Sequence, residues 1–136
     1  MIVVDSTVLL DLVLGESGRG PAWELLAADA RWAVPPLWRS EVANVLATRV
    51  RHGERTLESV LACLAYGREL LEEKEYPVAH DRVLRACAAS GCTAYDCEYV
   101  VLAETLGVPL VTSDRQVLDA FPGLAVTPEA FVKRGR

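Results

Sequence analysis

Residues 2–10 read IVVDSTVLL, and this stretch decides the fold of the chain. Residues 2–4 form a short continuous apolar run, which is typical of a strand buried on both faces. Asp5 closes the run, and residues 6–14 continue as an apolar helical segment. Aspartate is a common residue at the start of a helix because its side chain accepts hydrogen bonds from the first backbone N–H groups. The chain therefore opens with a buried strand that leads directly into a helix.

The same alternation of short apolar runs and helical periodicity continues along the chain. Further strands are predicted at 32–34, 76–78, 110–112 and 124–126, and helices at 21–29, 37–51, 57–73, 81–89, 93–106 and 114–120. Pro77 weakens the strand at 76–78, because proline cannot donate to a ladder. Short apolar strands separated by helices indicate a parallel sheet covered on both faces. We expect an α/β fold with three α/β/α layers around a short central parallel sheet, in a single domain over residues 1–136.

The composition fits a compact globular protein. The chain has 136 residues, enough to bury a core, and 51% of them are hydrophobic, which excludes an intrinsically disordered chain. No apolar stretch approaches the roughly 20 residues that a membrane-spanning helix needs. No basic segment precedes the first apolar run, as it would in a secretion signal. We therefore expect a cytoplasmic protein with no membrane span.

Neither the cysteines nor the net charge identifies a partner. Cys87, Cys92 and Cys97 have C-x4-C-x4-C spacing, unlike common zinc sites, so we expect these thiols and that of Cys63 to be free and buried. The net charge of −5 argues at first against a nucleic-acid partner. Four acids with a shared pattern contribute −4 of it, however, and bound cations would offset them.

These four acids lie where the chain changes direction: Asp5, Glu41, Asp96 and Asp114. Two of them follow predicted strands, and the other two lie in the opening turns of helices that can begin at the same edge. Sites in open parallel sheets form beyond the carboxyl ends of the strands. Carboxylates gathered there would bind a hard divalent cation, and such sites mostly serve phosphate chemistry. Each acid also has a structural interpretation as a helix cap or first-turn residue, and residues 93–96 resemble a capping box.

Four motifs, in this order, resemble those of PIN-domain proteins of the VapC toxin type: VVDSTVLL at 3–10, SEVANVL at 40–46, AYDCEYVVLA at 94–103 and LVTSD at 110–114. The resemblance spans essentially the whole chain. It implies a PIN-like fold and a ribonuclease that depends on Mg²⁺ or Mn²⁺, cuts structured RNA, often tRNA, and is blocked by an antitoxin protein.

The resemblance also assigns roles to the acids. It implies that Asp5, Asp96 and Asp114 are catalytic residues that bind the metal directly, and that Glu41 belongs to the same set and acts through water. Some relatives carry a further acid after the last motif; here the nearest is Asp119, which we expect to play at most a supporting part.

Other side chains are expected to assist the acids. Ser6 and Thr112 match hydroxyl positions of the family and Asn44 a polar position; with Ser113, they would orient carboxylates or waters. Arg39 and Arg115 are further candidates, which would contact substrate phosphates. Trp38 would either stack on a base or belong to the core. We expect His52 and His80 to be exposed and not catalytic.

Two other classes of protein that use an acidic pocket do not fit these residues. A haloacid-dehalogenase-type phosphatase needs a D-x-D motif where this chain has Thr7, and a receiver domain needs a lysine where Lys133 is poorly placed. A PIN-like module that binds RNA or protein without cutting remains open. As partners we expect an RNA, an antitoxin that lays a helix on residues 37–51 and 57–73, and a second copy of the chain in a homodimer.

Overall fold

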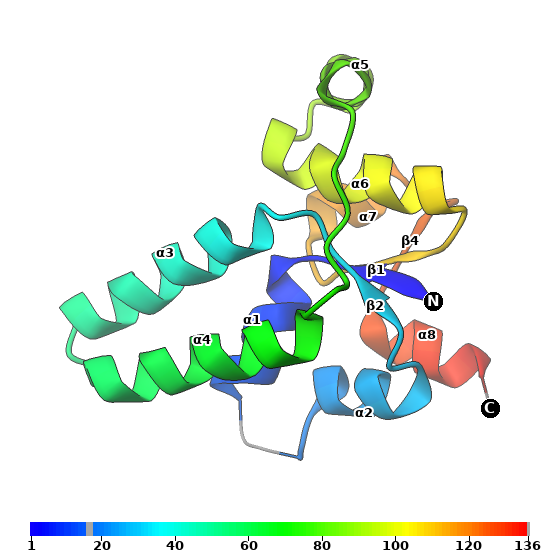
Figure 1. The fold of residues 1–136 in the computed structure, drawn as a ribbon. Helices are drawn as coiled ribbons and strands as arrows, with labels where there is room; N and C mark the ends of the chain where they lie inside the picture. The colour runs from blue at the N-terminus through cyan, green and yellow to red at the C-terminus, as the bar shows by residue number, and fades with distance from the viewer. Residues whose placement is uncertain (16–17, 136) are drawn as a thin grey trace.

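The computed structural model describes residues 1–15 and 18–135, and a parallel four-stranded sheet lies at its centre (Figure 1). The strands are β1 (Ile2–Val4), β2 (Trp32–Ala33), β3 (Leu110–Val111) and β4 (Ala125–Val126), in the spatial order β2-β1-β3-β4. Val3 in the middle of β1 pairs with Ala33 on one side and with Leu110 on the other. The parallel sheet predicted from the sequence is confirmed.

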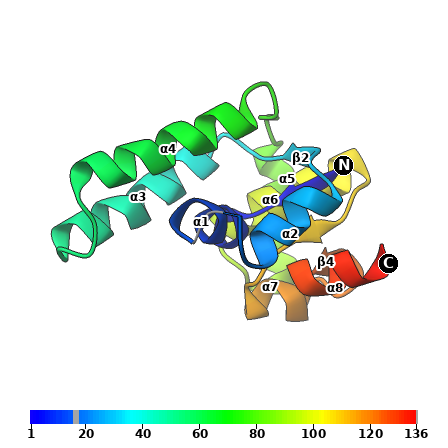
Figure 2. The ribbon, with the colours of Figure 1, turned by 90° about the horizontal axis from the view of Figure 1, so that it is seen from below.

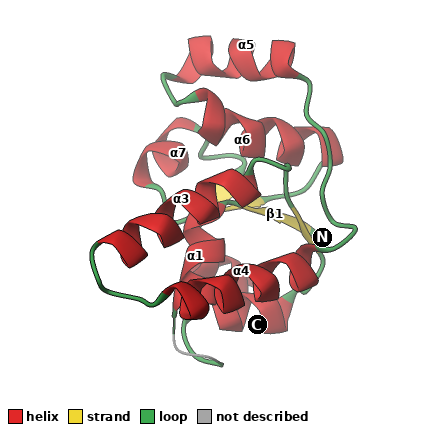
Figure 3. Cartoon of the chain, turned by 60° about the vertical axis from the view of Figure 1, so that its left-hand side comes forward, coloured by secondary structure: helices red, strands yellow, loops and turns green. Residues whose placement is uncertain are grey.

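Helices cover both faces of the sheet (Figures 1 and 3). One face packs on α1 (Ser6–Leu14), α2 (Pro21–Ala28) and α8 (Pro128–Arg134), and the other on α5 (His80–Ser90), α6 (Ala94–Leu106) and α7 (Arg115–Ala120). Successive residues of a strand point to opposite faces. Ile2 and Val4 therefore join the core on the α1 side, whereas Val3 joins the core on the α6 side. The two cores produce the predicted α/β/α layers.

Two further helices, α3 (Trp38–Arg51) and α4 (Leu57–Leu71), form a hairpin that projects from the side of this body (Figure 2). Trp38 at the start of α3 is buried, so its interpretation as a core residue is confirmed. Gly67 lets α4 approach it closely, because a Cβ at that position would lie 3.3 Å from the indole ring. Within the described residues, no helix is both long and apolar enough to cross a membrane.

The strand predicted at 76–78 is wrong. The structure has an isolated parallel bridge there, between Val34 and Glu75. Tyr76 donates its N–H to the carbonyl of Val34 at 2.9 Å, and Pro77 then has no N–H with which to continue the pairing. The segment is therefore a strap along the outer side of β2 and not a fifth strand in the described part of the chain.

All four cysteines are free. Cys92 and Cys97 are buried, as expected, whereas Cys63 and Cys87 are half-buried. Burial raises the pKa of the Cys97 thiol to about 12. This thiol therefore stays protonated at neutral pH and contributes to the core on the α6 side as a small apolar group.

Candidate active site

Asp5 lies directly after β1 and caps the start of α1. Its side chain is 6% exposed and is held by donors on both oxygens. Oδ1 accepts the backbone N–H and the hydroxyl of Thr7 at 3.1 and 2.5 Å, and Oδ2 accepts the hydroxyl of Thr112, the buried residue that follows β3. Burial raises the pKa of Asp5, although these hydrogen bonds favour its ionised form. Two strands thus fix one carboxylate at the carboxyl edge of the sheet.

Glu41 lies in the opening part of α3 and is half-buried. The buried hydroxyl of Tyr99, on α6, donates to its Oε1 at 2.6 Å. Burial raises the pKa of Glu41, and the negative charges of Asp96 and Asp5 raise it further, whereas the hydroxyls of Tyr99 and Ser6 act in the opposite direction. Glu41 is therefore close enough to Asp96 and Asp5 for their charges to act on it, and Figure 1 shows the first turns of α1, α3 and α6 beyond the end of β1.

Asp96 lies in the first turn of α6, where Thr93 caps the helix. The hydroxyl of Thr93 accepts the N–H of Asp96 at 3.1 Å. Among the residues that the structure describes, the return bond from Thr93 N–H to the Asp96 carboxylate is not formed, so the capping box is only half made. The carboxylate is half-buried, and its charge adds to the effect of burial in raising the pKa of Glu41.

Asp114 follows the carboxyl end of β3 and caps α7. Its Oδ1 accepts hydrogen bonds from the N–H groups of Gln116 and Val117 at 2.9 and 3.3 Å. The interpretation of Asp114 as a helix cap is therefore confirmed. Its own N–H donates to the hydroxyl of Thr112 at 2.9 Å, the same hydroxyl that donates to Asp5. Thr112 therefore connects the two aspartates.

The other predicted residues divide into two groups. Ser6 and Asn44 line, together with Glu41, a cavity of about 420 Å³ beside the acids. Arg39 lies elsewhere, because its guanidinium donates to both carboxylate oxygens of Glu75 at 2.9 and 2.5 Å. The remaining candidates are exposed, and they are Ser113, Arg115, Asp119, His52 and His80.

The sequence interpretation missed two residues that hold the acids. Thr7 donates its hydroxyl to Asp5 and accepts the N–H of Ser113 at 3.0 Å, so it joins the edges of β1 and β3. Tyr99 donates to Glu41 and is three residues after Asp96, on the same face of α6. That spacing was the available signal for Tyr99, but its partner lies 58 residues away in the chain.

The possible metal ligands at this edge are the oxygen atoms of carboxylates and hydroxyls, which are the ligands that a hard divalent cation prefers. Burial is the largest cause of the raised pKa of Glu41, and the charges of Asp96 and Asp5 add to it; a cation would offset these charges. Across residues 1–15 and 18–135, however, no three Asp, Glu, His or Cys side chains are already arranged as a metal-binding group. The Asp114 carboxylate, in particular, faces the N–H groups of α7.

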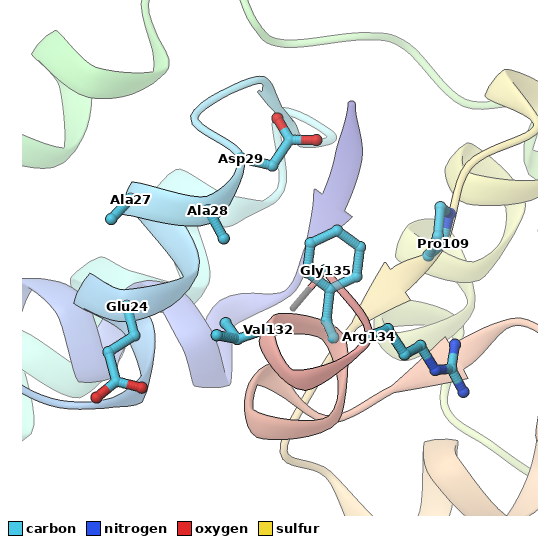
Figure 4. A pocket seen from close by; sticks show the side chains of 9 residues that line it. Glu24, Ala27, Ala28, Asp29, Pro109, Val132, Arg134 and Gly135 are labelled. Atoms are coloured by element: carbon cyan, nitrogen blue, oxygen red, sulfur yellow. The ribbon is translucent and has the colours of Figure 1, made fainter.

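A larger cavity, of about 680 Å³, lies near the opposite edge of the sheet, between α2 and α8 (Figure 4). It is lined by Asp29 before β2, Pro109 before β3, and side chains such as Phe131 and Arg134 on α8. None of the acids predicted to be catalytic lines it. Its size does not make it the active site.

Comparisons with known proteins identify the family to which the fold belongs. The family model for the PIN domain matches residues 2–123. The VapC ribonuclease Mb0985 of Mycobacterium bovis is 35% identical over 136 residues, which cover 98% of this chain and 100% of that protein.

Two solved structures have the same fold. PAE2754 from Pyrobaculum aerophilum superposes with a TM-score of 0.78 at 26% identity, over 98% of this chain and 88% of that one. A chain of a toxin–antitoxin complex from Klebsiella pneumoniae superposes with a TM-score of 0.67 at 18% identity, over 94% and 98% of the two chains, and at that identity the likeness shows the fold alone. With a family model over most of its length and a ribonuclease relative along all of it, this chain belongs to the PIN domain family, among the relatives of the VapC ribonucleases.

Proposed function

We propose that the chain is an endoribonuclease, the toxin of a toxin–antitoxin pair, which hydrolyses RNA phosphodiester bonds with Mg²⁺ or Mn²⁺. The observation that carries this proposal is the placement of the acids: Thr7 and Thr112 hold Asp5 at the carboxyl edge of the sheet, and Tyr99, on the helix that carries Asp96, holds Glu41. Carboxylates that repel one another at the carboxyl edge of a parallel sheet lower the stability of the metal-free fold. They suit a site that binds a cation. The names of the relatives as VapC ribonucleases support RNA as the substrate.

In this proposal Asp5, Asp96 and Asp114 bind the metal directly, and Glu41 acts through a water molecule. A divalent cation at this site would lower the pKa of a water molecule and neutralise charge on the phosphate. Thr112 and Thr7 keep Asp5 in one orientation, and Tyr99 does the same for Glu41. Asp114 would have to turn away from the start of α7 to contribute its carboxylate, and Arg115 beside it would contact a substrate phosphate.

The test is cleavage of total RNA with Mn²⁺, with EDTA, and with Asp96→Asn. We expect EDTA to abolish cleavage and Asp96→Asn to lower the rate by about a hundredfold or more, since a lost metal ligand removes several kcal/mol of transition-state stabilisation. Asp119→Asn is the matched control, because this exposed acid lies on the far part of α7 and should leave the rate unchanged. Cleavage that survives both EDTA and Asp96→Asn would sink the proposal.

A PIN-like module that binds RNA or protein without cutting is the second candidate, and the engagement of the Asp114 carboxylate by the first N–H groups of α7 favours it. The same assay separates the two. A silent module would bind RNA but leave it intact in Mn²⁺.

For partners, we propose an antitoxin that lays a helix on α3 and α4, and a homodimer, and we propose that the chain itself is cytoplasmic. Leu57, Leu61 and Tyr66 are exposed along α4, which is unusual for side chains of this size and suits a helix of another protein. tRNA is the proposed class of RNA. Sedimentation of the wild-type chain and of Leu61→Glu, each with and without an antitoxin, tests the contact at α4. If both chains sediment with the same size under both conditions, the contact is contradicted.

A further inference from the structure

The cavity of about 420 Å³ beside the acids lies between α1, α3 and the start of α6. Ser6 and Glu41 belong both to this cavity and to the carboxylate site. A group bound in the cavity would therefore lie next to the phosphate on which the acids act. The cavity and the acids form one continuous surface.

Tyr95 forms the α6 side of this cavity. Its side chain is 61% exposed, although it directly precedes Asp96, whereas Tyr99 one turn later is 2% exposed. Thr93 caps the helix in front of it, so the ring stands on the ordered first turn of α6. An exposed aromatic ring on a fixed turn has no part in either core of the described residues, but it offers a flat face to a ligand.

The opposite side of the cavity comes from α3. Leu37 and Val45 provide apolar surface, and Ser40 and Asn44 provide exposed hydroxyl and amide groups. An amide both donates and accepts hydrogen bonds, as the edge of a nucleobase does. The combination of an aromatic face, an apolar side and one amide is what a single unstacked base requires.

Charge also favours a base over other parts of an RNA. Glu41 lines the cavity and lies close to Asp96 and Asp5, so a phosphate placed there would be repelled. A nucleobase is uncharged and would meet no such repulsion. The backbone of the same nucleotide would then lie toward the acids.

We propose that Tyr95 is the platform on which one unpaired nucleobase of the RNA stacks, beside the phosphodiester that is cut, and that Asn44 contacts the edge of that base. This inference rests on the proposed ribonuclease function and gives it a base-binding subsite. Tyr95 is then a residue that contacts the substrate, and Asn44 contributes to the choice of base.

The test uses single-stranded RNA pools that carry 2-aminopurine at one internal position and random bases elsewhere. 2-Aminopurine loses fluorescence when it stacks on an aromatic ring, so binding can be followed in the Asp96→Asn background with Mn²⁺, without cleavage. We expect quenching with Tyr95 and with Tyr95→Phe. Tyr95→Ala should abolish the quenching and weaken binding roughly 5- to 150-fold, the range for loss of one stacked base.

Leu84→Ala is the matched control, because Leu84 is 66% exposed on α5 and remote from the cavity. It should change neither quenching nor affinity. Equal quenching and equal affinity for Tyr95 and Tyr95→Ala would overturn the inference, as would RNA with abasic residues binding as tightly as intact RNA.

A kinetic readout separates this inference from the function itself. With the acids intact and Mn²⁺ present, Tyr95→Ala should raise KM more than it lowers kcat, and Asn44→Ala should relax the base preference next to the cut. If the wild-type chain cuts RNA but Tyr95→Ala has the same KM, the inference fails alone. If the wild-type chain cuts nothing, the ribonuclease proposal fails, and the fluorescence result still decides whether Tyr95 stacks on a base.

Discussion

Tyr99 is 2% exposed, and its hydroxyl lies 2.6 Å from Oε1 of Glu41. Burial, and then the charge of Glu41, raises the pKa of Tyr99. The hydroxyl therefore remains protonated and donates at every pH at which the site would work. This bond joins α6 to α3, and it is one of the few polar contacts between the two helices that carry Asp96 and Glu41.

Tyr99→Phe tests the role of this bond. We expect it to cost about 1–2 kcal/mol of unfolding free energy at neutral pH, because Glu41 loses a donor to its charged form. It should also raise the pKa of Glu41 further, since the Tyr99 hydroxyl lowers it. Denaturant unfolding at neutral and acidic pH, with an NMR titration of Glu41, measures both effects.

Tyr66→Phe is the control for this substitution, because Tyr66 stacks on Trp23 away from the acids. It should leave the stability almost unchanged. If Tyr99→Phe destabilises the protein as much at a pH where Glu41 is protonated as at neutral pH, the loss is one of packing and the hydrogen bond to the charged form is not its cause.

At the scale of elements, the start of α6 decides where Tyr95 and Asp96 stand. Gly91 ends α5 in the left-handed region with φ of 76°, and Thr93 then caps α6 two residues later. Ala in that conformation is strained, although a Cβ at Gly91 would meet no atom within 4 Å. The turn therefore depends on the backbone freedom of this glycine.

We expect Gly91→Ala to cost about 1 kcal/mol of stability. Gly123→Ala is a matched control, since this glycine also has open space around its Cβ but no left-handed backbone. It should be neutral or slightly stabilising. Thermal unfolding of the two variants measures the difference, and equal melting temperatures would contradict the argument.

The elements that could be predicted from the sequence are those with strong local signals. The helix at 6–14 was predicted with the bounds that α1 has, because its apolar run starts after a capping aspartate. The strand at 76–78 was wrong, because two or three apolar residues next to a proline carry almost no information on pairing. Of the candidate site, all four acids were expected together; Glu41 lies near Asp5 and Asp96, whereas the Asp114 carboxylate accepts the first N–H groups of α7. The contact between Arg39 and Glu75 could not be predicted, because Glu75 lies 36 residues away in the chain and reaches the start of α3 only in the folded protein.

At the scale of the whole molecule, the acids make stability depend on pH and on metal. The pKa values of Asp5 and Glu41 are raised above their ordinary values of 3.8 and 4.5. As the pH rises past these values, the unfolded chain releases both protons while the folded chain still holds them. The metal-free fold therefore loses stability through this range, up to the folded pKa values.

Glu41→Gln removes one of these acids while leaving an oxygen for Tyr99. In EDTA, from about pH 4 to pH 8, its melting temperature should rise above that of the wild type as the pH increases, by a few degrees at neutral pH. Mn²⁺ should raise the melting temperature of the wild type by mass action, and that of Glu41→Gln less. Asp119→Asn, an exposed acid, should behave as the wild type in both respects. If neither Mn²⁺ nor Glu41→Gln changes the melting temperature, a shared acidic site is contradicted.

The hydroxyl of Thr112 donates to Asp5 across 107 residues of sequence, and Thr7 accepts the N–H of Ser113 across 106. During synthesis on the ribosome, Asp5 and Thr7 emerge together, and Thr112 follows 107 residues after Asp5. Until residues 110–114 have left the ribosome, β1 has no β3 beside it and the Asp5 carboxylate has no Thr112 to orient it. A nascent chain that lacks residues 110–114 is thus unable to assemble the proposed site.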